Sequence, residues 1–269
     1  MFTEATMDKI LVFIPMYNCE KQIPRVLAQL KGEVSQYISE VIVVNNRSTD
    51  NSVQAAEDYA KNNLDIPVTI MTNSDNYWLG GSHKVAFHYA IDNGFDYVIT
   101  LHGDDQGRID DFIPLLKSGE YRDYDCCLGS RFVKGSKLIG YSKIRIWGNH
   151  CFNLLFTLAA GKSIKDLGSG LNLYKVETLK SEYFEKFPDA LYFNAVMVLA
   201  HRCYKHKIWF YPITWREDDQ VSNMKFMNLS TNMIKMCFKY FFRRKKYIES
   251  EMRDKIVDEY ISDTVFTNK

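Results

Sequence analysis

Short apolar runs alternate with helical patterns through the first hundred residues, and this order constrains the fold more than any other feature. Four runs are rich in β-branched residues, which is typical of buried parallel strands. These runs are residues 10–15, 40–44, 68–71 and 97–101. The segments between them, 20–30, 53–59 and 82–93, have the spacing of helices. The order predicts an α/β fold in which helices flank a doubly wound, mostly parallel, Rossmann-like sheet.

Polar turns follow three of these strands. They are residues 17–18, 45–50 and 102–106. In doubly wound sheets, ligands bind at the carboxyl ends of the strands, and all three turns lie there. The first half of the chain is therefore expected to build one binding crevice lined with polar groups.

The composition is that of an ordinary folded protein. The chain has 269 residues, of which 46% are hydrophobic and 25% charged, enough for one large α/β domain with or without a small appendage. A net charge of +1 gives no general case for nucleic-acid binding. We therefore expect no nucleic-acid partner.

Cysteine usage and the N-terminus indicate a reducing compartment. The six cysteines form no C-x-x-C pair, which favours buried free thiols. The first ten residues contain two acids and lack the apolar region of a signal peptide. No apolar run approaches the ~20 residues of a membrane span. We expect a cytoplasmic protein.

The second half of the chain is less regular. Residues 125–130 and 208–214 have the character of strands, and residues 148–160 that of an apolar helix. We expect a domain of residues 1–226, followed by an amphipathic, basic, helical extension of residues 227–269. The last twenty residues are polar, and we expect them to be helical or frayed.

The turn after the fourth strand carries hard oxygen ligands. Asp104, Asp105 and Gln106 are adjacent on a short loop, an arrangement that suits Mg²⁺ or Mn²⁺. A divalent ion there would neutralise a diphosphate leaving group. The alternative is that the aspartates only cap the turn and its helix.

Other candidates are weaker when taken singly. Amides and a carboxylate in the first two turns could hydrogen-bond a base and a ribose, although Asn and Asp also favour turns. These residues are Asn18, Asn45, Asn46 and Asp50. Three arginines suit phosphate oxygens, although each could be an ordinary surface or ion-pair residue. They are Arg131, Arg145 and Arg216. His83 and His102 are candidate ligands or acid–base groups.

Six motifs occur together in one order along residues 8–226. They are PMYNCE at 15–20, VIVVNNRSTDNS at 41–52, LHGDDQG at 101–107, GSRF at 129–132, DLGSGLNLY at 166–174 and WREDDQVSN at 215–223. In this order the chain resembles glycosyltransferase family 2, whose fold is called GT-A. Within that family it is most similar to the dolichol-phosphate or polyprenol-phosphate mannosyltransferase branch.

The resemblance implies a metal-dependent, inverting glycosyltransferase. It would move a sugar from a nucleotide-diphosphate sugar to a polyprenyl phosphate or a glycan, with Mg²⁺ or Mn²⁺ as cofactor. The implied metal ligands are Asp104, Gln106 and His102, and the implied catalytic residues are Asp104, Asp166 and Arg216. Substrate would be bound by Pro15, Tyr17, Asn18, Glu20, Asn46, Asp50, Arg131, Ser169 and Asp218.

A general base is needed only for an alcohol acceptor. Asp166 is the best placed by sequence, and Asp218 and Asp219 are its rivals. A polyprenyl phosphate is already an anion and does not strictly need a base.

The chain departs from the family pattern at several positions. His102 stands where the first metal-binding aspartate is expected, and Asn45 and Asn46 replace the two aspartates of the base pocket. Arg47 replaces a glycine and Asn172 an arginine. Imidazole is an acceptable ligand for Mn²⁺ but a poorer one for Mg²⁺. These changes keep a second function open, a catalytically degenerate protein that only binds a nucleotide-sugar.

A sugar nucleotidyltransferase is a further alternative. That class would need a glycine-rich phosphate loop with a basic residue near the first strand, which PMYNCEKQ lacks.

Two segments could contact a membrane. Residues 151–160 are apolar, and residues 233–247 combine aromatic side chains with the basic run 243–246. Such segments suit the surface of an anionic bilayer, and they would place the protein peripherally at its inner face. Packing against the core explains the same spacing, so both interpretations stay open.

Overall fold

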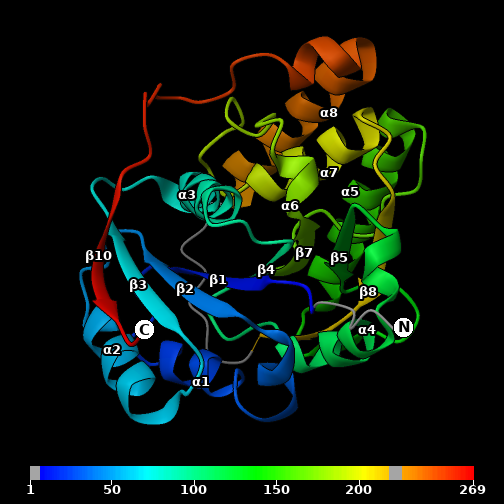
Figure 1. Cartoon of the computed structure of the whole chain (residues 1–269). Helices are drawn as coiled ribbons and strands as arrows, with labels where there is room; N and C mark the ends of the chain where they lie inside the picture. The colour runs from blue at the N-terminus through cyan, green and yellow to red at the C-terminus, as the bar shows by residue number, and fades with distance from the viewer. Residues whose placement is uncertain (1–6, 218–225) are drawn as a thin grey trace, which may run out of the picture.

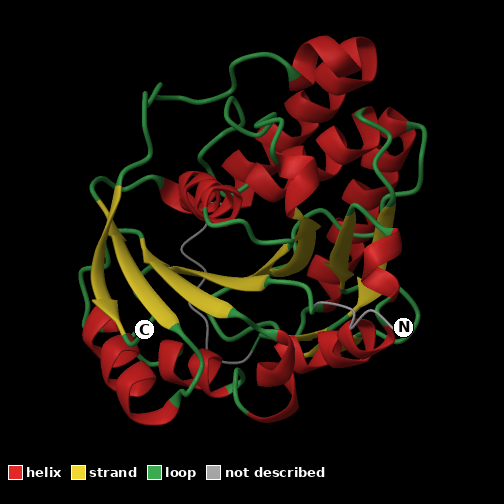
Figure 2. Cartoon of the chain, in the orientation of Figure 1, coloured by secondary structure: helices red, strands yellow, loops and turns green. Residues whose placement is uncertain are grey.

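An eight-stranded sheet forms the centre of the fold, in the order β10-β3-β2-β1-β4-β7-β5-β8. The computed structural model describes residues 7–217 and 226–269. Helices cover both faces of the sheet (Figure 1; Figure 2). The predicted α/β architecture is confirmed.

The first half supplies the parallel part of this sheet. Strand β1 (Ile10–Met16) pairs in parallel with β2 (Glu40–Asn45) and β4 (Tyr97–Leu101), and β2 pairs with β3 (Val68–Asn73). The four predicted strands are therefore confirmed. Alternate side chains of β1 enter two separate apolar clusters, as a sheet buried on both faces requires: Leu11 and Phe13 point to one, Val12 and Ile14 to the other.

The two faces carry different helices. On one face lie α1 (Ile23–Ala28), α2 (Ser52–Asn63) and α4 (Ile113–Ser118), with the short 3₁₀ turns Gly32–Tyr37, Ile109–Phe112 and Glu120–Asp123. On the other face lie the remaining helices. They are α3 (Trp78–Asp92), α5 (Lys143–Ala160), α6 (Val176–Leu179), α7 (Phe193–Cys203) and α8 (Phe226–Ile248).

The second half extends the sheet with mixed pairing. Strand β7 (Leu171–Lys175) lies antiparallel between β4 and β5 (Cys126–Ser130), and β8 (Ile208–Pro212) pairs in parallel with β5. A separate parallel pair joins β6 (Lys137–Ile139) to β9 (Thr214–Arg216). The strands expected at 125–130 and 208–214 are confirmed, the second in two pieces.

The C-terminal residues are packed into the same body as the rest. Helix α8 contributes buried Cys237 and Tyr240 to the cluster that α5 and α7 share. The expectation of a helical or frayed C-terminus is wrong for β10 (Ser262–Thr267), which pairs antiparallel with β3. The free edge of β3 offers unpaired backbone groups, and a short strand with Val265 and Phe266 satisfies them.

Two further features bear on the sequence predictions. All six cysteines are free thiols; Cys151 is exposed and Cys203 half-buried, so the expectation of buried thiols holds for the other four. None of the helices in the described parts of the chain has both the length and the apolarity to cross a bilayer.

Candidate active site

The predicted polar turns do meet at one edge of the sheet. The strand order β3-β2-β1-β4 reverses direction between β1 and β4, the point at which doubly wound sheets bind ligands. The turns after β1, β2 and β4 all lie at this point. The three turns therefore lie together at the edge of the sheet where the sequence predicts a crevice.

The first two turns are joined by hydrogen bonds between their backbones and side chains. The amide of Asn18 donates to Ser48 Oγ at 3.0 Å, and its side-chain Oδ1 accepts from the amide of Thr49 at 2.7 Å. Asn18 and Arg47 have φ values of 49° and 65°, in the left-handed region. The two loops therefore form one preformed unit.

Asp50 anchors the same unit. Its carboxylate accepts from the amide of Glu20 at 3.1 Å and from the amide of Ser52 at 3.1 Å. Burial raises the pKa of Asp50, but these hydrogen bonds and that from the Ser52 hydroxyl outweigh it and hold the pKa below its ordinary value. Asp50 is therefore ionised at neutral pH.

The two asparagines after β2 hold neighbouring loops. Asn45 Oδ1 accepts from the amide of Ser48 at 3.0 Å. Asn46 is buried, and its Oδ1 accepts from the amide of Tyr77 at 2.8 Å while its Nδ2 donates to Asn76 at 2.8 Å. Asn46 thereby ties the β2 turn to the loop before α3.

The third turn contains an ion cluster that sequence spacing did not predict. Asp105 has a φ of 59° and lies almost fully buried. Its carboxylate accepts from Arg25 Nε at 2.6 Å, from Gln29 at 3.0 Å and from Arg216. Arg25 lies in α1 and Gln29 directly follows that helix, 80 and 76 residues before Asp105, and no local pattern links them to Asp105. Two cationic side chains thus stand beside the DDQ turn.

Asp104 and Gln106 lie beside this cluster. Both are partly exposed, and Asp104 Oδ1 accepts from the amide of Gln106 at 3.1 Å. Among the described residues, no three His, Cys, Asp or Glu side chains form a group that could hold a metal ion. Mg²⁺ is usually held by one or two carboxylates together with substrate phosphates. Asp104 therefore fits a cation that takes its other ligands from a diphosphate.

The ring of His102 packs against the backbone of Gly170. A Cβ added at Gly170 would lie 2.6 Å from His102 Cγ, so only glycine fits beside the ring. His102 Nε2 is buried and has no hydrogen-bond partner in the described structure. Burial lowers the pKa of His102 to about 4. The imidazole is therefore neutral, the form that binds metals, but its Nε2 is shielded from solvent.

Arg131 and Asp166 form a buried ion pair. Arg131 donates from Nε to Asp166 Oδ2 at 2.8 Å and from Nη2 to Oδ1 at 2.7 Å, and its backbone amide donates to Oδ2 at 2.9 Å. The amide of Gly168 also donates to Asp166, at 3.2 Å. Because these donors occupy both carboxylate oxygens, Asp166 is not available as a free base.

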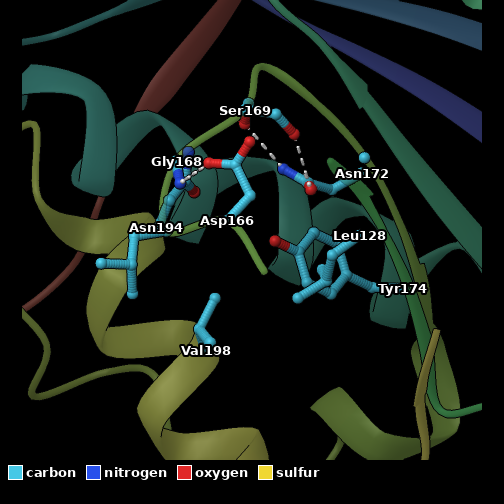
Figure 3. A pocket seen from close by; sticks show the side chains of 10 residues that line it. Leu128, Asp166, Gly168, Ser169, Asn172, Tyr174, Asn194 and Val198 are labelled. Atoms are coloured by element: carbon cyan, nitrogen blue, oxygen red, sulfur yellow. Dashed lines mark hydrogen bonds between the residues drawn. The ribbon is translucent and has the colours of Figure 1, made fainter. Parts of the chain in front are cut away.

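A small cavity lies beside Asp166 and Ser169 (Figure 3). Its volume is about 10 Å³, room for about one water molecule. The buried Oδ1 of Asn194 lines it and has no partner among the described residues. Ser169 Oγ donates to the carbonyl of Leu171 at 3.2 Å. This cavity is too small for a sugar or a nucleotide.

The remaining predicted residues are placed as follows. The carbonyl of Pro15 accepts from the amide of Gly103 at 3.1 Å, which joins β1 to the third turn. Tyr17 and Glu20 are exposed at the first turn. The amide of Arg216 donates to the carbonyl of Gln106 at 2.9 Å. Asp218 and Asp219 lie outside the described residues.

Comparisons with known proteins agree on one family. The family model described as "Glycosyl transferase family 2" matches residues 11–182. The undecaprenyl-phosphate mannosyltransferase of Micrococcus luteus is 26% identical over 173 residues, which cover 64% of this chain and 69% of that protein. An undecaprenyl-phosphate 4-deoxy-4-formamido-L-arabinose transferase of Proteus mirabilis is 30% identical over 65% of this chain and 51% of that protein.

Solved structures show the same fold at low sequence identity. Glucosyl-3-phosphoglycerate synthase from Mycobacterium tuberculosis, solved with uridine diphosphate, has a TM-score of 0.62 and 13% identity over 87% of this chain and 80% of that one. A mannosyltransferase from Pyrobaculum calidifontis, solved with GDP-mannose and Mn²⁺, has a TM-score of 0.59 and 14% identity over 90% of this chain and 65% of that one.

Proposed function

The chain belongs to glycosyltransferase family 2, and from that premise we propose that it moves a sugar from a nucleotide-diphosphate sugar to a polyprenyl phosphate by a metal-dependent, inverting displacement. The observation that carries the proposal is the convergence of three turns at the switch point of the sheet, the third of which contains Asp104. Two relatives, from Micrococcus luteus and Proteus mirabilis, have undecaprenyl phosphate in their names, which supports the same acceptor class.

The donor would bind at the joined turns. Asn18, Asn46 and Asp50 would border the base and ribose, with Tyr17 and Glu20 exposed beside them. Because these loops are already held by hydrogen bonds, little ordering would accompany donor binding.

The diphosphate would lie at the DDQ turn. Asp104 and Gln106 would hold Mg²⁺ or Mn²⁺, which when bound would neutralise the charge on the departing diphosphate. Arg25 and Arg216 surround Asp105 and leave their guanidinium groups close to the same edge. Fixed positive charge at this position stabilises the leaving group.

The transfer itself is a single displacement. The acceptor oxygen forms a bond to the anomeric carbon on the face opposite the leaving group, while the bond from that carbon to the diphosphate oxygen breaks. The electron pair leaves with the nucleoside diphosphate, and the configuration at the anomeric carbon inverts.

The state of Asp166 favours a phosphate acceptor over an alcohol. An alcohol needs a base to take its proton, whereas Asp166 is held by Arg131 through both carboxylate oxygens. A phosphate monoester is already ionised and attacks without a base. The pair Arg131–Asp166 then serves to position the loop that carries Ser169.

The outer face of α5 supports contact with a membrane. Ile144, Trp147, Leu154 and Leu158 recur at helical spacing and are all exposed, Trp147 to 70%. This stripe is opposite the buried residues Asn153 and Phe156. It begins next to the site, where Arg145 pairs with Glu217 at 2.5 Å.

Helix α8 continues this surface. Cys237 Sγ lies 3.5 Å from the carbonyl of Leu155, and the guanidinium of Arg244 lies beside Gly161, so the two helices run side by side in the same direction. Four of the exposed residues of α8 are also apolar, among others that are polar or basic. They are Ile234, Phe238, Phe241 and Phe242.

Cations border the aromatic residues of α8. A groove of about 550 Å³ at the break in α8, where Arg243 leaves helical geometry, is lined by aromatic and basic residues. They include Phe238, Lys239, Phe242, Arg243 and Lys246. Apolar side chains beside exposed cations suit the interface of an anionic bilayer. We assign this surface to such a bilayer, which would hold the protein peripherally where a polyprenyl phosphate resides.

A second function, nucleotide-sugar binding without transfer, rests on one observation. His102 replaces a metal-binding carboxylate, and its Nε2 is shielded in the described structure. If no metal can be held, donor binding would occur without turnover.

The test is transfer of labelled sugar into lipid. The protein is incubated with a panel of nucleotide-sugars, Mn²⁺ and vesicles containing polyprenyl phosphate, next to Asp104→Asn and the exposed control Asp110→Asn. The proposal expects one donor to label the lipid with wild type and control but not with Asp104→Asn. Donor binding without labelled lipid, when every component is present, would establish the binding-only function instead.

A further inference from the structure

Residues 249–261 form the C-terminal segment that connects α8 to β10, and this segment passes the start of α3. Figure 1 shows this course, from α8 past α3 to the edge strand. The segment lies outside residues 11–182, which carry the family pattern. It therefore needs its own explanation.

Two neighbouring residues of this segment contact the loop between β3 and α3. The carbonyl of Ile261 accepts from the amide of Ser74 at 3.1 Å and from its hydroxyl at 3.3 Å. The ring of Tyr260 meets that of Tyr77 edge to face, with centroids 5.1 Å apart. Ser74 Oγ and Tyr77 Oη are themselves 2.7 Å apart. The loop is thus held from outside by the C-terminal segment.

Tyr260 is itself fixed by a buried charge. Lys84 is fully buried, and its Nζ donates to Asp189 Oδ1 at 2.7 Å, to the carbonyl of Phe187 at 2.7 Å and to Tyr260 Oη at 3.0 Å. The Tyr260 hydroxyl donates to the same Asp189 oxygen at 2.8 Å. A buried ammonium needs such a complete set of partners, so this network over-determines the position of Tyr260.

Glycine at position 81 allows the close approach. A Cβ there would lie 2.4 Å from Tyr77 Cβ and 3.1 Å from the ring of Tyr260. The helix start, the loop and the C-terminal segment are therefore in direct contact.

The loop held in this way is part of the donor edge. The amide of Tyr77 donates to Asn46 Oδ1, and Asn76 accepts from Asn46 Nδ2, both at 2.8 Å. The next residue, Trp78, has a φ of 56° and is 59% exposed. A bulky residue in the left-handed region is strained, and such strain persists only where surrounding contacts impose it.

We propose that Tyr260 is a positioning residue of the donor site, which holds the strained loop 74–78 and through it Asn46 in the conformation that receives the nucleotide. This inference rests on the proposed function, because it assumes that a nucleoside diphosphate binds beside Asn46. The C-terminal segment then acts on donor affinity and leaves the chemistry at Asp104 unchanged.

The test compares Tyr260→Phe with Tyr37→Phe, a partly buried tyrosine packed on the opposite face of the sheet. Tyr260→Phe keeps the ring on Tyr77 and removes only the hydroxyl that meets Lys84 and Asp189. We expect the Kd for UDP or GDP with Mn²⁺ to rise about fivefold, and the KM for the donor to rise equally while kcat stays unchanged. Tyr37→Phe should leave all three values at the wild-type level.

The outcomes separate the two claims. If wild type binds a nucleoside diphosphate and Tyr260→Phe binds it equally well, the positioning role is overturned while the proposed function stands. A lower Tm with an unchanged Kd is the result of a purely structural tyrosine and overturns the role in the same way. If wild type binds no nucleoside diphosphate, the donor site fails and the inference fails with it.

Discussion

The proposed donor side, formed by the turns after β1, β2 and β4, and the proposed acceptor side, formed by α5, α8 and the loop of Asp166, differ in the chemistry that they present. On the donor side, the turns after β1 and β2 are joined by hydrogen bonds through Asn18, Ser48 and Asp50. On the acceptor side, α5 and α8 have exposed apolar residues, which include Trp147 and Phe242. Small polar ligands favour preformed polar loops, whereas a lipid surface favours apolar area and cations.

The difference also concerns buried charge. The donor turns use hydrogen bonds to the Asp50 carboxylate near the surface, while the acceptor side contains the deeply buried pair Arg131–Asp166. Removing one partner of such a pair leaves the other charged and uncompensated. The two sides should therefore respond differently to substitution.

The largest stability loss should follow from breaking the acceptor-side ion pair. Arg131→Ala leaves Asp166 buried without its cation, and we expect the free energy of unfolding to fall by about 3–5 kcal/mol. Urea unfolding followed by circular dichroism measures it. The double variant Arg131→Met, Asp166→Asn should recover part of the loss, because it removes the uncompensated charge and keeps a side-chain oxygen for the backbone amides of Arg131 and Gly168. A fall of less than about 1 kcal/mol for Arg131→Ala would show that the pair is not the anchor of this side.

The next largest effect is on binding to a membrane, and it should not extend to the donor side. Phe238→Ser with Phe242→Ser removes two exposed rings from α8. Burial of each ring in a bilayer contributes about 1.5 kcal/mol or more, so partitioning onto phosphatidylglycerol vesicles should weaken about 100-fold. Co-sedimentation measures the partitioning, and nucleotide affinity should not change.

The matched control for the membrane surface is the double variant Ile256→Ser, Val265→Ser. Both residues are apolar and exposed, and both lie outside α5 and α8. It should partition like wild type. Equal loss in both double variants would mean that binding depends on general apolarity and not on this surface.

A smaller effect tests the preformed donor turns. The buried hydroxyl of Ser52 accepts from the amide of Cys19 at 2.8 Å and donates to Asp50 at 2.5 Å. Ser52→Ala leaves that amide without its acceptor, which should cost about 1–2 kcal/mol of unfolding free energy and weaken nucleoside diphosphate binding. Ser35→Ala, at an exposed hydroxyl, is the control and should change neither quantity.

The smallest effect appears as a pH dependence of stability. Burial lowers the pKa of His83 to about 3 and that of His102 to about 4, from an ordinary value of 6.5. The unfolded chain therefore binds more protons than the folded one below pH 6.5. The stability that each neutral histidine contributes is fully present well above pH 6.5 and is lost as the pH falls toward 4. The loss is about 1 kcal/mol per histidine at pH 6.

His83→Phe tests this prediction, because Phe fits among the rings of Phe13, Phe87 and Phe193. The variant should show a shallower decline of unfolding free energy between pH 7 and pH 5 than wild type. An identical slope in both proteins would contradict a buried, neutral His83.

The sequence predicted the donor side better than the acceptor side for a physical reason. Strands β1 to β4 are buried on both faces, so their runs are continuous and apolar, and each turn residue follows its strand directly. The partners of Asp105 could not be predicted in this way, because Arg25 and Arg216 reach it across 80 and 111 residues of chain.

The C-terminal strand was missed because its pattern is weak. Residues 262–267 are mostly polar and mostly exposed, and the free edge of β3 selects their extended form. The network of Lys84, Asp189 and Tyr260 has the same character, since its members lie 71 or more residues apart. Side-chain exposure on α5 and α8 likewise needed the structure, because helical spacing alone fits either core packing or a membrane.

The most direct test of the account is calorimetric titration of UDP and GDP into the protein, with and without Mn²⁺, for wild type and Asp104→Asn. The account predicts that one nucleoside diphosphate binds wild type much more tightly when Mn²⁺ is present, and that Asp104→Asn loses this dependence. Binding that ignores both Mn²⁺ and Asp104, or no binding of either nucleotide, would contradict the donor site at the carboxyl ends of β1, β2 and β4.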